Sequence, residues 1–331
     1  MIISKTPYRI SFFGGGTDYK EWYSEHGSEI ISSSINKYIY LSVRKLPPFF
    51  KKKNRFIYSS IEEVDNFNNL KLYPLKKILN YEKIKNGIEF HYDGQMPAKS
   101  GVGSSSSFVV GLLKLCSSMK NFNLNKYDLA KKSIYIERNI LKEVVGIQDQ
   151  IATSFGGLNY IKIDKKGTFK VKKIFKNKND EIKLNNNLVL LYTGLQKLDR
   201  KELKNYVGNL KSKSFDNMKL LSELTHEAKK TLNNKKFNDF GRLLDESWKI
   251  KKKLSKYISN SSVDNIYKLA IKNGAFGGKI LGAGGGGFFL FYVPIEIRKR
   301  FLKKMDFLLN INFKFEDEGS RIILKDEDEK I

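Results

Sequence analysis

The stretch "PAKSGVGSSSSFVVG", residues 97–111, holds residue types that together can bind a phosphate group. Gly101 and Gly103 precede four serines, and an apolar helical run follows at once. Serine side chains can cap such a helix, and the free N–H groups and dipole of its first turn attract an anion. The stretch is not a Walker A loop, because no Gly-Lys-Ser/Thr follows four residues after a glycine. It predicts a phosphate site at a helix start; a serine-capped core helix with a flexible lead-in is the alternative.

Two carboxylates further along the chain occupy helical positions that face the protein interior. Glu137 has isoleucine or leucine three residues before it and three and four residues after it. Asp149 has Val145 four residues before it and Ala152 three residues after it. A buried carboxylate is costly unless it is paired or binds a metal. An ion pair with a lysine or arginine is one explanation; beside a phosphate loop, a Mg²⁺ ligand and a proton acceptor are the other.

Two glycine clusters suggest that a ligand approaches bare backbone. In "SFFGGGTDY", residues 11–19, three consecutive glycines carry an entropic cost that one tight turn does not require. They either leave room in a substrate pocket or accommodate a neighbouring element of the protein. In "GGKILGAGGGGFFLFYV", residues 277–293, the glycines formally satisfy G-x-G-x-x-G, but a strand follows where a dinucleotide-binding fold needs a helix. This cluster predicts a loop that closes over a ligand; a hairpin turn is the alternative.

Composition restricts the class of protein. The chain has 331 residues, enough for two domains, and its net charge of +26 comes from lysines spread along its length. That charge would attract acidic small substrates, and a nucleic-acid-binding protein is the remote alternative. One cysteine, Cys116, and three scattered histidines argue against disulfides, zinc and histidine-based nucleophilic catalysis. No apolar run approaches a membrane span and no signal-peptide pattern is present, so we expect a cytoplasmic protein without membrane or nucleic-acid partners.

Strands alternate with helices along the chain, which predicts an α+β fold. The polar run at residues 176–187 is the best domain boundary, so we expect an N-terminal domain over residues 1–180 and a C-terminal domain over 181–331. The pattern predicts strands at 2–13, 29–45, 188–194, 277–281 and 287–293, helices at 104–119, 126–143 and 146–154, a hairpin at 156–175, and a long helical region at 200–272.

Three segments carry a resemblance to a known family. "TPYRISFFGGGTDY", "PAKSGVGSSSSFVVG" and "KILGAGGGGFF" resemble, in this order, the three motifs of the GHMP kinase superfamily. Each motif is moderately specific, and together they span nearly the whole chain. The resemblance implies a two-domain α+β GHMP kinase fold with ATP bound between the domains and Mg²⁺ as cofactor. A sugar phosphate is the expected second partner, and the oligomeric state is left open.

The resemblance also implies roles for individual residues. Asp149 matches the catalytic aspartate, and Arg9 matches the basic residue near the transferred phosphoryl group. Glu137 and Ser104, or Ser105 after a shift of one residue, match the metal ligands. Asp18 matches an aspartate that binds sugar hydroxyls. The residues implied to bind ATP are Lys99, Gly101, Val102, Gly103, Ser104, Ser105 and Ser106. Those implied to bind substrate are Gly14, Gly15, Gly16, Thr17, Asp18, Gly284, Gly285, Lys197 and Arg200.

Within the superfamily, "FGGGTDY", "QDQIATSFGG" and "LLYTG" resemble most the D-glycero-D-manno-heptose 7-phosphate kinases. Galactokinases carry a Glu-His pair where this chain has Gly15 and Gly16, which argues against galactose. The implied reaction converts ATP and heptose 7-phosphate to the 1,7-bisphosphate, for nucleotide-activated heptose synthesis. Lys197 and Arg200, or residues 51–53 with Arg55, are candidates to hold the 7-phosphate. The alternatives are a kinase for a fucose- or galactose-like sugar and a non-catalytic, nucleotide-binding member.

Overall fold

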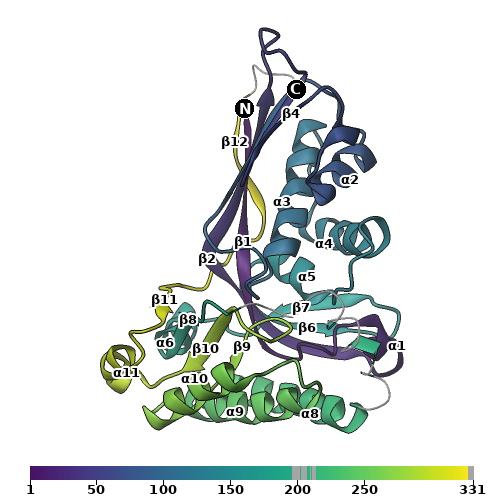
Figure 1. The fold of residues 1–331 in the computed structure, drawn as a ribbon. Helices are drawn as coiled ribbons and strands as arrows, with labels where there is room; N and C mark the ends of the chain where they lie inside the picture. The colour runs from purple at the N-terminus through teal and green to yellow at the C-terminus, as the bar shows by residue number, and fades with distance from the viewer. Residues whose placement is uncertain (196–201, 203–206, 209, 211–213, 327–331) are drawn as a thin grey trace.

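Two β-sheets organise the computed structural model, which describes residues 1–195, 202, 207, 208, 210 and 214–326 (Figure 1). The larger sheet has the order β12-β1-β2-β5-β3-β4, with β6 also paired to β2 and β7 to β6; the smaller has the order β11-β8-β10-β9. The strands are β1(Ile2–Phe13), β2(Ser28–Lys45), β3(Asn54–Ile57), β4(Ile61–Val64), β5(Ile88–Gly94), β6(Leu158–Ile163), β7(Phe169–Lys173), β8(Leu188–Tyr192), β9(Gly277–Ile280), β10(Phe288–Tyr292), β11(Leu309–Asn310) and β12(Arg321–Lys325).

Strand β2 is the backbone of the larger sheet. Its 18 residues pair with β1 along one edge; on the other edge the C-terminal half pairs with β5 and the N-terminal end with β6. Strand β12 pairs with β1 (Figure 1), and the Met1 amino group lies 3.0 Å from Asp326 Oδ2, at the last described residue. The boundary expected after residue 180 therefore separates sequence segments, while the larger sheet takes strands from both.

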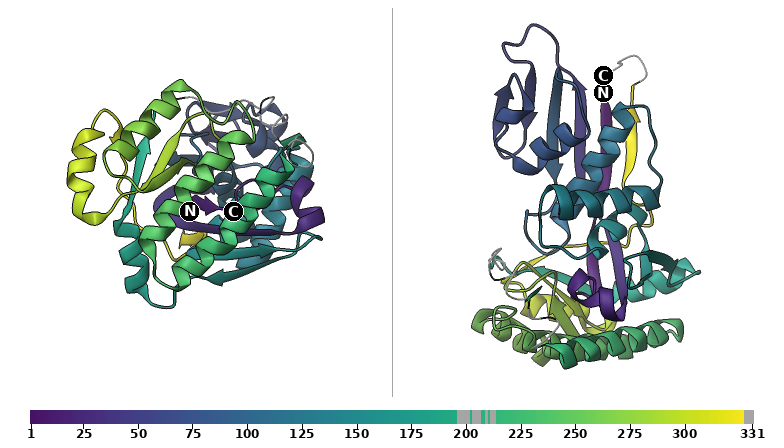
Figure 2. Two further views of the ribbon diagram at one scale, coloured as in Figure 1. Left: turned by 90° about the horizontal axis from the view of Figure 1, so that it is seen from below. Right: turned by 90° about the vertical axis from the view of Figure 1, so that its right-hand side faces the viewer.

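Two helical layers cover the sheets. Helices α2 to α5 lie along one face of the larger sheet, and α8 and α9 form a layer at the end of the molecule where the smaller sheet lies (Figures 1 and 2). The helices are α1(Lys20–His26), α2(Tyr73–Tyr81), α3(Ser104–Met119), α4(Lys126–Tyr135), α5(Gln148–Phe155), α6(Lys178–Asn186), α8(Phe215–Asn233), α9(Phe237–Lys253), α10(Ser261–Lys272) and α11(Arg298–Lys304). Over the described part of the chain, no helix is long and apolar enough to cross a membrane.

One apolar core runs between the sheets. At the end of β1, the rings of Phe12 and Phe13 pack edge-on against Phe240 of α9, with centroids 5.5 and 5.2 Å apart. The end of β1 is thereby held against the layer that carries the smaller sheet, and the residues nearby on β1 face the junction.

Most predicted elements are confirmed, and the differences have local causes. The strand at 2–13 and the helix at 104–119 are present at those bounds. The polar run at 176–187 contains helix α6, which buries Leu184 together with two acidic residues. The helical region expected at 200–272 contains α8, α9 and α10, separated by turns. Strand β4 and helix α2 were not expected, since their short segments carry weak periodic signals.

Candidate active site

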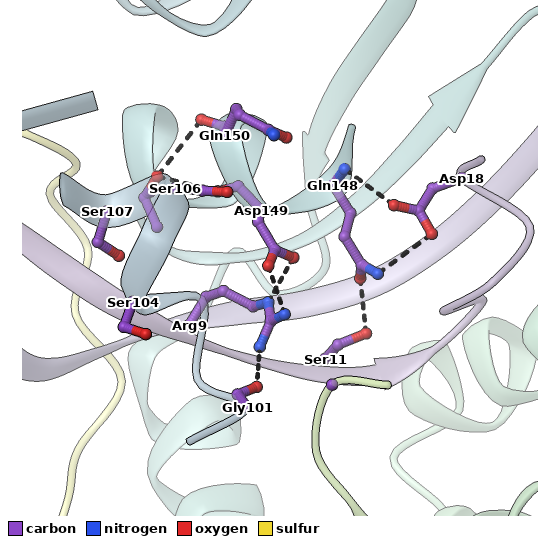
Figure 3. Close-up of polar contacts among 12 residues, drawn as sticks. Arg9, Ser11, Asp18, Gly101, Ser104, Ser106, Ser107, Gln148, Asp149 and Gln150 are labelled. Atoms are coloured by element: carbon purple, nitrogen blue, oxygen red, sulfur yellow. Dashed lines mark hydrogen bonds and ion pairs between the residues drawn. The ribbon is translucent and has the colours of Figure 1, made fainter. Parts of the chain in front are cut away.

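Arg9 and Asp149 form a two-bonded ion pair at the centre of the candidate site (Figure 3). Arg9 Nε donates to Asp149 Oδ1 at 2.6 Å and Nη2 donates to Oδ2 at 2.5 Å. The third guanidinium nitrogen donates to the carbonyl oxygen of Gly101. Arg9 is 4% exposed, whereas the Asp149 side chain remains 23% exposed. Arg9 thus holds the carboxylate in one orientation and links it to the phosphate-loop backbone, while Asp149 keeps an open side.

The start of α3 presents backbone N–H groups beside this pair. Its N-cap residue is Gly103 with a φ of 77°, and no side chain of the described residues caps it. The expectation of a serine cap is therefore wrong: the Ser104 hydroxyl instead accepts a hydrogen bond from the Lys99 N–H at 3.1 Å. A Cβ on Gly103 would lie 3.0 Å from Arg9 Cγ and 3.5 Å from Asp149 Oδ2. N–H groups that no cap occupies, next to a guanidinium, suit an anion.

Glu137 is completely buried because the helix before it changes form. The helix expected over 126–143 ends at Tyr135, and a π-helical turn, Ile136–Ile140, follows. Such turns re-aim single side chains and occur often at functional sites. The Ser106 hydroxyl donates to the Glu137 carboxylate, 3.1 and 2.9 Å from its two oxygens, and Gln150 Nε2 donates to it as well. The expectation that Glu137 faces inward is confirmed, and the described ion pairs include none for it.

The surroundings of Glu137 suit a small divalent cation. Burial raises the pKa of Glu137 to about 7, the nearby Asp149 charge adds to the rise, and hydrogen bonds from Gln150 and Ser106 oppose it. Gln150 Oε1 is buried without a hydrogen-bond partner. Carboxylate, hydroxyl and amide oxygens are ligands that Mg²⁺ accepts while it keeps water and phosphate oxygens. No group of three or more His, Cys, Asp or Glu in the described residues could hold a metal by itself.

The serine that contacts Glu137 is Ser106, and this bears on the expected metal ligands. Ser104 and Ser105 begin α3 on its more exposed side, and the Ser104 hydroxyl is engaged by Lys99. In this structure, the oxygen atoms that face one another and could serve together as cation ligands are therefore those of Ser106 and Glu137. Ser104 stays a prediction as a cation ligand.

Asp18 belongs to a second network beside the ion pair (Figure 3). Its carboxylate accepts hydrogen bonds from the N–H of Gly16 at 3.1 Å and from the backbone N–H and side-chain Nε2 of Gln148, both at 3.2 Å. The Ser11 hydroxyl donates to Gln148 Oε1 at 2.6 Å. Burial raises the pKa of Asp18, and the charge of Asp149 raises it further, so the two carboxylates face a common region. Gln148 and Asp149, adjacent on α5, connect the two networks.

The glycines at residues 14–16 have reasons within the protein. A Cβ on Gly14 would lie 2.0 Å from the Glu29 carbonyl oxygen of β2, and Gly14 and Gly16 have φ values of 80° and 105°. Of the two explanations open from the sequence, contact with a neighbouring element therefore holds for Gly14. Gly15 has room for a Cβ, with its nearest neighbours 3.5 Å away. Thr17 is buried and its hydroxyl donates to the Gly14 carbonyl at 2.7 Å, which holds the turn.

The third glycine cluster also packs on protein. A Cβ on Gly284 would lie 2.8 Å from the backbone of Ile258, and the Gly285 N–H donates to the Ile258 carbonyl at 2.9 Å. A Cβ on Gly287 would lie 2.2 Å from the Ser100 carbonyl oxygen. The loop therefore lies directly against the phosphate loop. These contacts explain the glycines without a ligand, and the substrate contacts expected of Gly284 and Gly285 stay predictions.

The basic residues considered for a second phosphate fall in two places. Lys197 and Arg200 lie outside the described residues. Residues 51–53 follow β2 beyond the Met1 end of β1, whereas Arg9 pairs with Ser34 near the other end. More than ten residues of extended chain separate them, about 30 Å at ~3.3 Å per residue. The loop at 51–53 and Arg55 are thus too distant to contact a group bound at Arg9.

Sequence reasoning missed the two glutamines that flank Asp149. Gln148 contacts Asp18 (Figure 3), and Gln150 contacts Glu137. Their signal was available in "GIQDQ", where three polar residues begin a buried helix. Their partners come from segments more than ten residues away, so the spacing alone did not assign them.

A phosphate loop, a carboxylate–arginine pair and a buried cation-suited cluster together define a phosphotransferase of small molecules. Residues 71–157 match the model of the GHMP kinases N terminal domain, and residues 228–304 match that of the GHMP kinases C terminal region. The D-glycero-alpha-D-manno-heptose 7-phosphate kinase of Campylobacter jejuni is 31% identical over 314 residues, 92% of this chain and 93% of that protein. The mevalonate kinase of Methanocaldococcus jannaschii is 30% identical over 250 residues, 73% of this chain and 74% of that protein.

Solved structures agree on the fold. A structure described as a D-glycero-D-manno-heptose 1-phosphate kinase from Bacteroides thetaiotaomicron superposes with a TM-score of 0.81 at 22% identity, over 99% of this chain and 100% of that chain. A putative sugar kinase from Campylobacter jejuni superposes with a TM-score of 0.76 at 27% identity, over 97% of both chains. The chain belongs to the GHMP kinase family, and the resemblance of its three motifs is confirmed. It is an ATP-dependent kinase of this family, a phosphotransferase.

Proposed function

We propose that the protein transfers the γ-phosphoryl group of ATP to the C1 hydroxyl of D-glycero-D-manno-heptose 7-phosphate, which gives the 1,7-bisphosphate. The observation that carries this proposal is the 31% identity, over 92% of the chain, to a relative named for heptose 7-phosphate. The resemblance of "FGGGTDY", "QDQIATSFGG" and "LLYTG" to heptose 7-phosphate kinases supports it from the sequence, as does the presence of Gly15 and Gly16 where galactokinases carry a Glu-His pair.

Asp149 orients the acceptor hydroxyl and takes its proton. Each carboxylate oxygen has about two acceptor sites, and Arg9 occupies one on each. The open side of Asp149 leaves the remaining sites for the substrate. Because Arg9 clamps both oxygens, the carboxylate does not rotate as the hydroxyl approaches. Arg9 also places positive charge beside the first turn of α3, where the transferred group would pass.

The phosphate groups of ATP bind along residues 99–106. The backbone N–H groups at the start of α3 and of the loop glycines donate hydrogen bonds to the phosphate oxygens. Arg9 holds the loop in place through its hydrogen bond to the Gly101 carbonyl. Ser106 and Glu137, with Gln150 beside them, would hold Mg²⁺. When bound, Mg²⁺ supplies neutralising charge to the phosphate oxygens. Glu137 must then be ionised, which its hydrogen bonds from Ser106 and Gln150 favour.

Asp18 and Gln148 bind the hydroxyl groups of the sugar. Asp18 already accepts three hydrogen bonds from the protein, so about one of its acceptor sites remains for a hydroxyl. Gln148 lies between Asp18 and Asp149. It holds Asp18 in place, while Asp149 receives the reacting hydroxyl. The sugar would therefore lie along the side of α5 that these residues share.

A coupled assay across acceptors tests the proposal. Heptose 7-phosphate, free heptose, mannose 6-phosphate, galactose and fucose are compared by kcat/KM at fixed Mg²⁺–ATP, with Asp149→Asn as the inactive control. Heptose 7-phosphate should exceed each alternative by at least about tenfold, a difference of 1.4 kcal/mol in transition-state binding. If galactose or fucose is preferred by that margin, the heptose assignment is wrong and the kinase assignment stands. If no acceptor reacts although calorimetry detects ATP binding, the protein is a non-catalytic, nucleotide-binding member.

A further inference from the structure

Two buried lysines lie at the junction of the sheets, and neither had been expected from the sequence to act. Lys279 of β9 is 4% exposed, and its Nζ donates to the carbonyl oxygen of Phe12, at the end of β1, at 2.7 Å. Lys251 of α9 is 5% exposed, and its Nζ donates to the carbonyl oxygen of Gly282 at 2.5 Å. Lys279 therefore joins the smaller sheet to the strand that carries Arg9, and Lys251 holds the start of the third glycine cluster.

Among the described residues, the charges that act most strongly on Lys279 are of its own sign. Burial, followed by the charges of Lys251 and Arg9, lowers the pKa of Lys279 well below its usual range. Within the described part of the chain, the Lys279 ammonium group has a hydrogen bond to a neutral carbonyl, which uses one of its three donors. Arg9 is neutralised by Asp149. A buried ammonium group without a counter-charge is costly, and truncating it to a neutral side chain relieves that cost.

The position of the two lysines relates them to the reacting groups. Lys279 begins the segment that leads into the loop at 282–287, and this loop contacts the phosphate loop at Ser100. Phe12, its hydrogen-bond partner, lies three residues from Arg9 on β1 and two residues before Gly14. The lysines thus lie between the reacting pair, the sugar-side turn and the third glycine cluster. An acceptor whose C1 hydroxyl meets Asp149 would lie beside this junction, because Arg9, which pairs with Asp149, is close enough to Lys279 for its charge to act on it.

We propose that Lys279 and Lys251 bind the phosphate group that the acceptor sugar already carries. This inference rests on the proposed function, because it requires an acceptor with a phosphate monoester. The ligand chemistry is a phosphate dianion, which supplies a counter-charge for the Lys279 ammonium group and accepts strong, charge-assisted hydrogen bonds from both lysines. The γ-phosphoryl group of ATP shares this chemistry, so the experiment must separate the two sources.

Calorimetric titration of inorganic phosphate, with the ATP site filled, separates them. The protein is first saturated with Mg²⁺ and a non-hydrolysable ATP analogue, which occupies the α-, β- and γ-phosphate positions. Phosphate should still bind the wild-type protein and the control Lys272→Met, an exposed lysine of α10. Lys279→Met and Lys251→Met should each weaken binding by about tenfold or more, the scale of a lost charge-assisted hydrogen bond. A response that occurs only with ADP would assign the lysines to the γ-phosphoryl position and overturn the proposal.

Acceptor selectivity gives the second measurement. The ratio of kcat/KM for heptose 7-phosphate to that for free heptose should fall by about 30- to 1000-fold in Lys279→Met, since the variant no longer recognises the phosphate. An unchanged ratio, with phosphate affinity equal to wild type, would make Lys279 a structural tie to Phe12. If Lys279→Met does not fold, Lys251→Met decides both measurements. Phosphate titration involves no sugar, so it can succeed where the heptose assignment fails.

Discussion

Replacement of Glu137 by glutamine keeps the shape of a fully buried side chain and removes its ability to ionise. Burial raises the pKa of Glu137 from its usual 4.5 to about 7. Between these values the folded protein holds the proton, whereas the unfolded chain has released it. Because the unfolded state binds fewer protons in this window, the free energy of unfolding falls as pH rises through it. Stability is fully present below about pH 4.5 and the loss is complete above about pH 7.

The size of the effect follows from the same values. Each tenfold change in an ionisation constant corresponds to about 1.4 kcal/mol, so the rise from 4.5 to about 7 destabilises the metal-free protein by about 3 kcal/mol at high pH. About 2 kcal/mol of this loss develops between roughly pH 5 and pH 7.5. The Glu137→Gln variant lacks the ionisation. Its free energy of unfolding, relative to wild type, should therefore increase by about 2 kcal/mol across that range.

Urea denaturation in EDTA, at pH values from 5 to 7.5, measures this difference. The matched control is Glu223→Gln, an exposed carboxylate of α8, whose difference from wild type should stay constant. Taking differences between proteins removes the contribution of other titrating groups, such as Asp18. The reasoning is refuted if the difference in the free energy of unfolding between Glu137→Gln and wild type changes by less than about 0.5 kcal/mol from pH 5 to pH 7.5. In the same variant, apparent Mg²⁺ affinity measured with ADP should fall, because an amide is a poorer ligand than a carboxylate.

Three further changes test the rest of the site. Asp149→Asn should fold and bind ATP but lose roughly 10²–10⁴-fold in kcat, the scale of a positioned acid–base group, and near-normal turnover would exclude it from the chemistry. Gly14→Ala should lower the free energy of unfolding by about 2–5 kcal/mol, because the added Cβ would overlap the β2 backbone. The control Gly87→Ala also has a positive φ but lies in open space, and it should lower the free energy of unfolding by about 1 kcal/mol. Equal losses for the two variants in urea denaturation would contradict the overlap. Gln148→Leu removes the side-chain donor to Asp18, while the backbone N–H of residue 148 still donates, and should raise KM for the sugar at least about tenfold with KM for ATP little changed; parallel changes in both constants would argue for general damage.

Local patterns were sufficient to identify the residues whose roles depend on their own segment. The phosphate loop and the bounds of α3 follow from glycines and serines placed before an apolar helical run. The inward position of Glu137 follows from its apolar neighbours at helical spacing. Arg9 and Asp149 were found through motifs, yet their pairing was not, since 140 positions separate them. Periodicity reports which face of an element is buried, and it carries no information about what lies opposite.

The tertiary structure decided each feature that depends on two distant segments. Gly14 is bare because β2 passes within contact distance, although from the sequence a sugar pocket explained it equally well. Glu137 meets Ser106 from within a π-helical turn, and no composition rule predicts where such a turn falls. Lys279 looks like any other lysine in a lysine-rich chain until β9 buries it against the end of β1. The sequence alone determined which chemical groups were available; burial and long-range approach, which set their charge and their partners, came only from the packing of the two sheets.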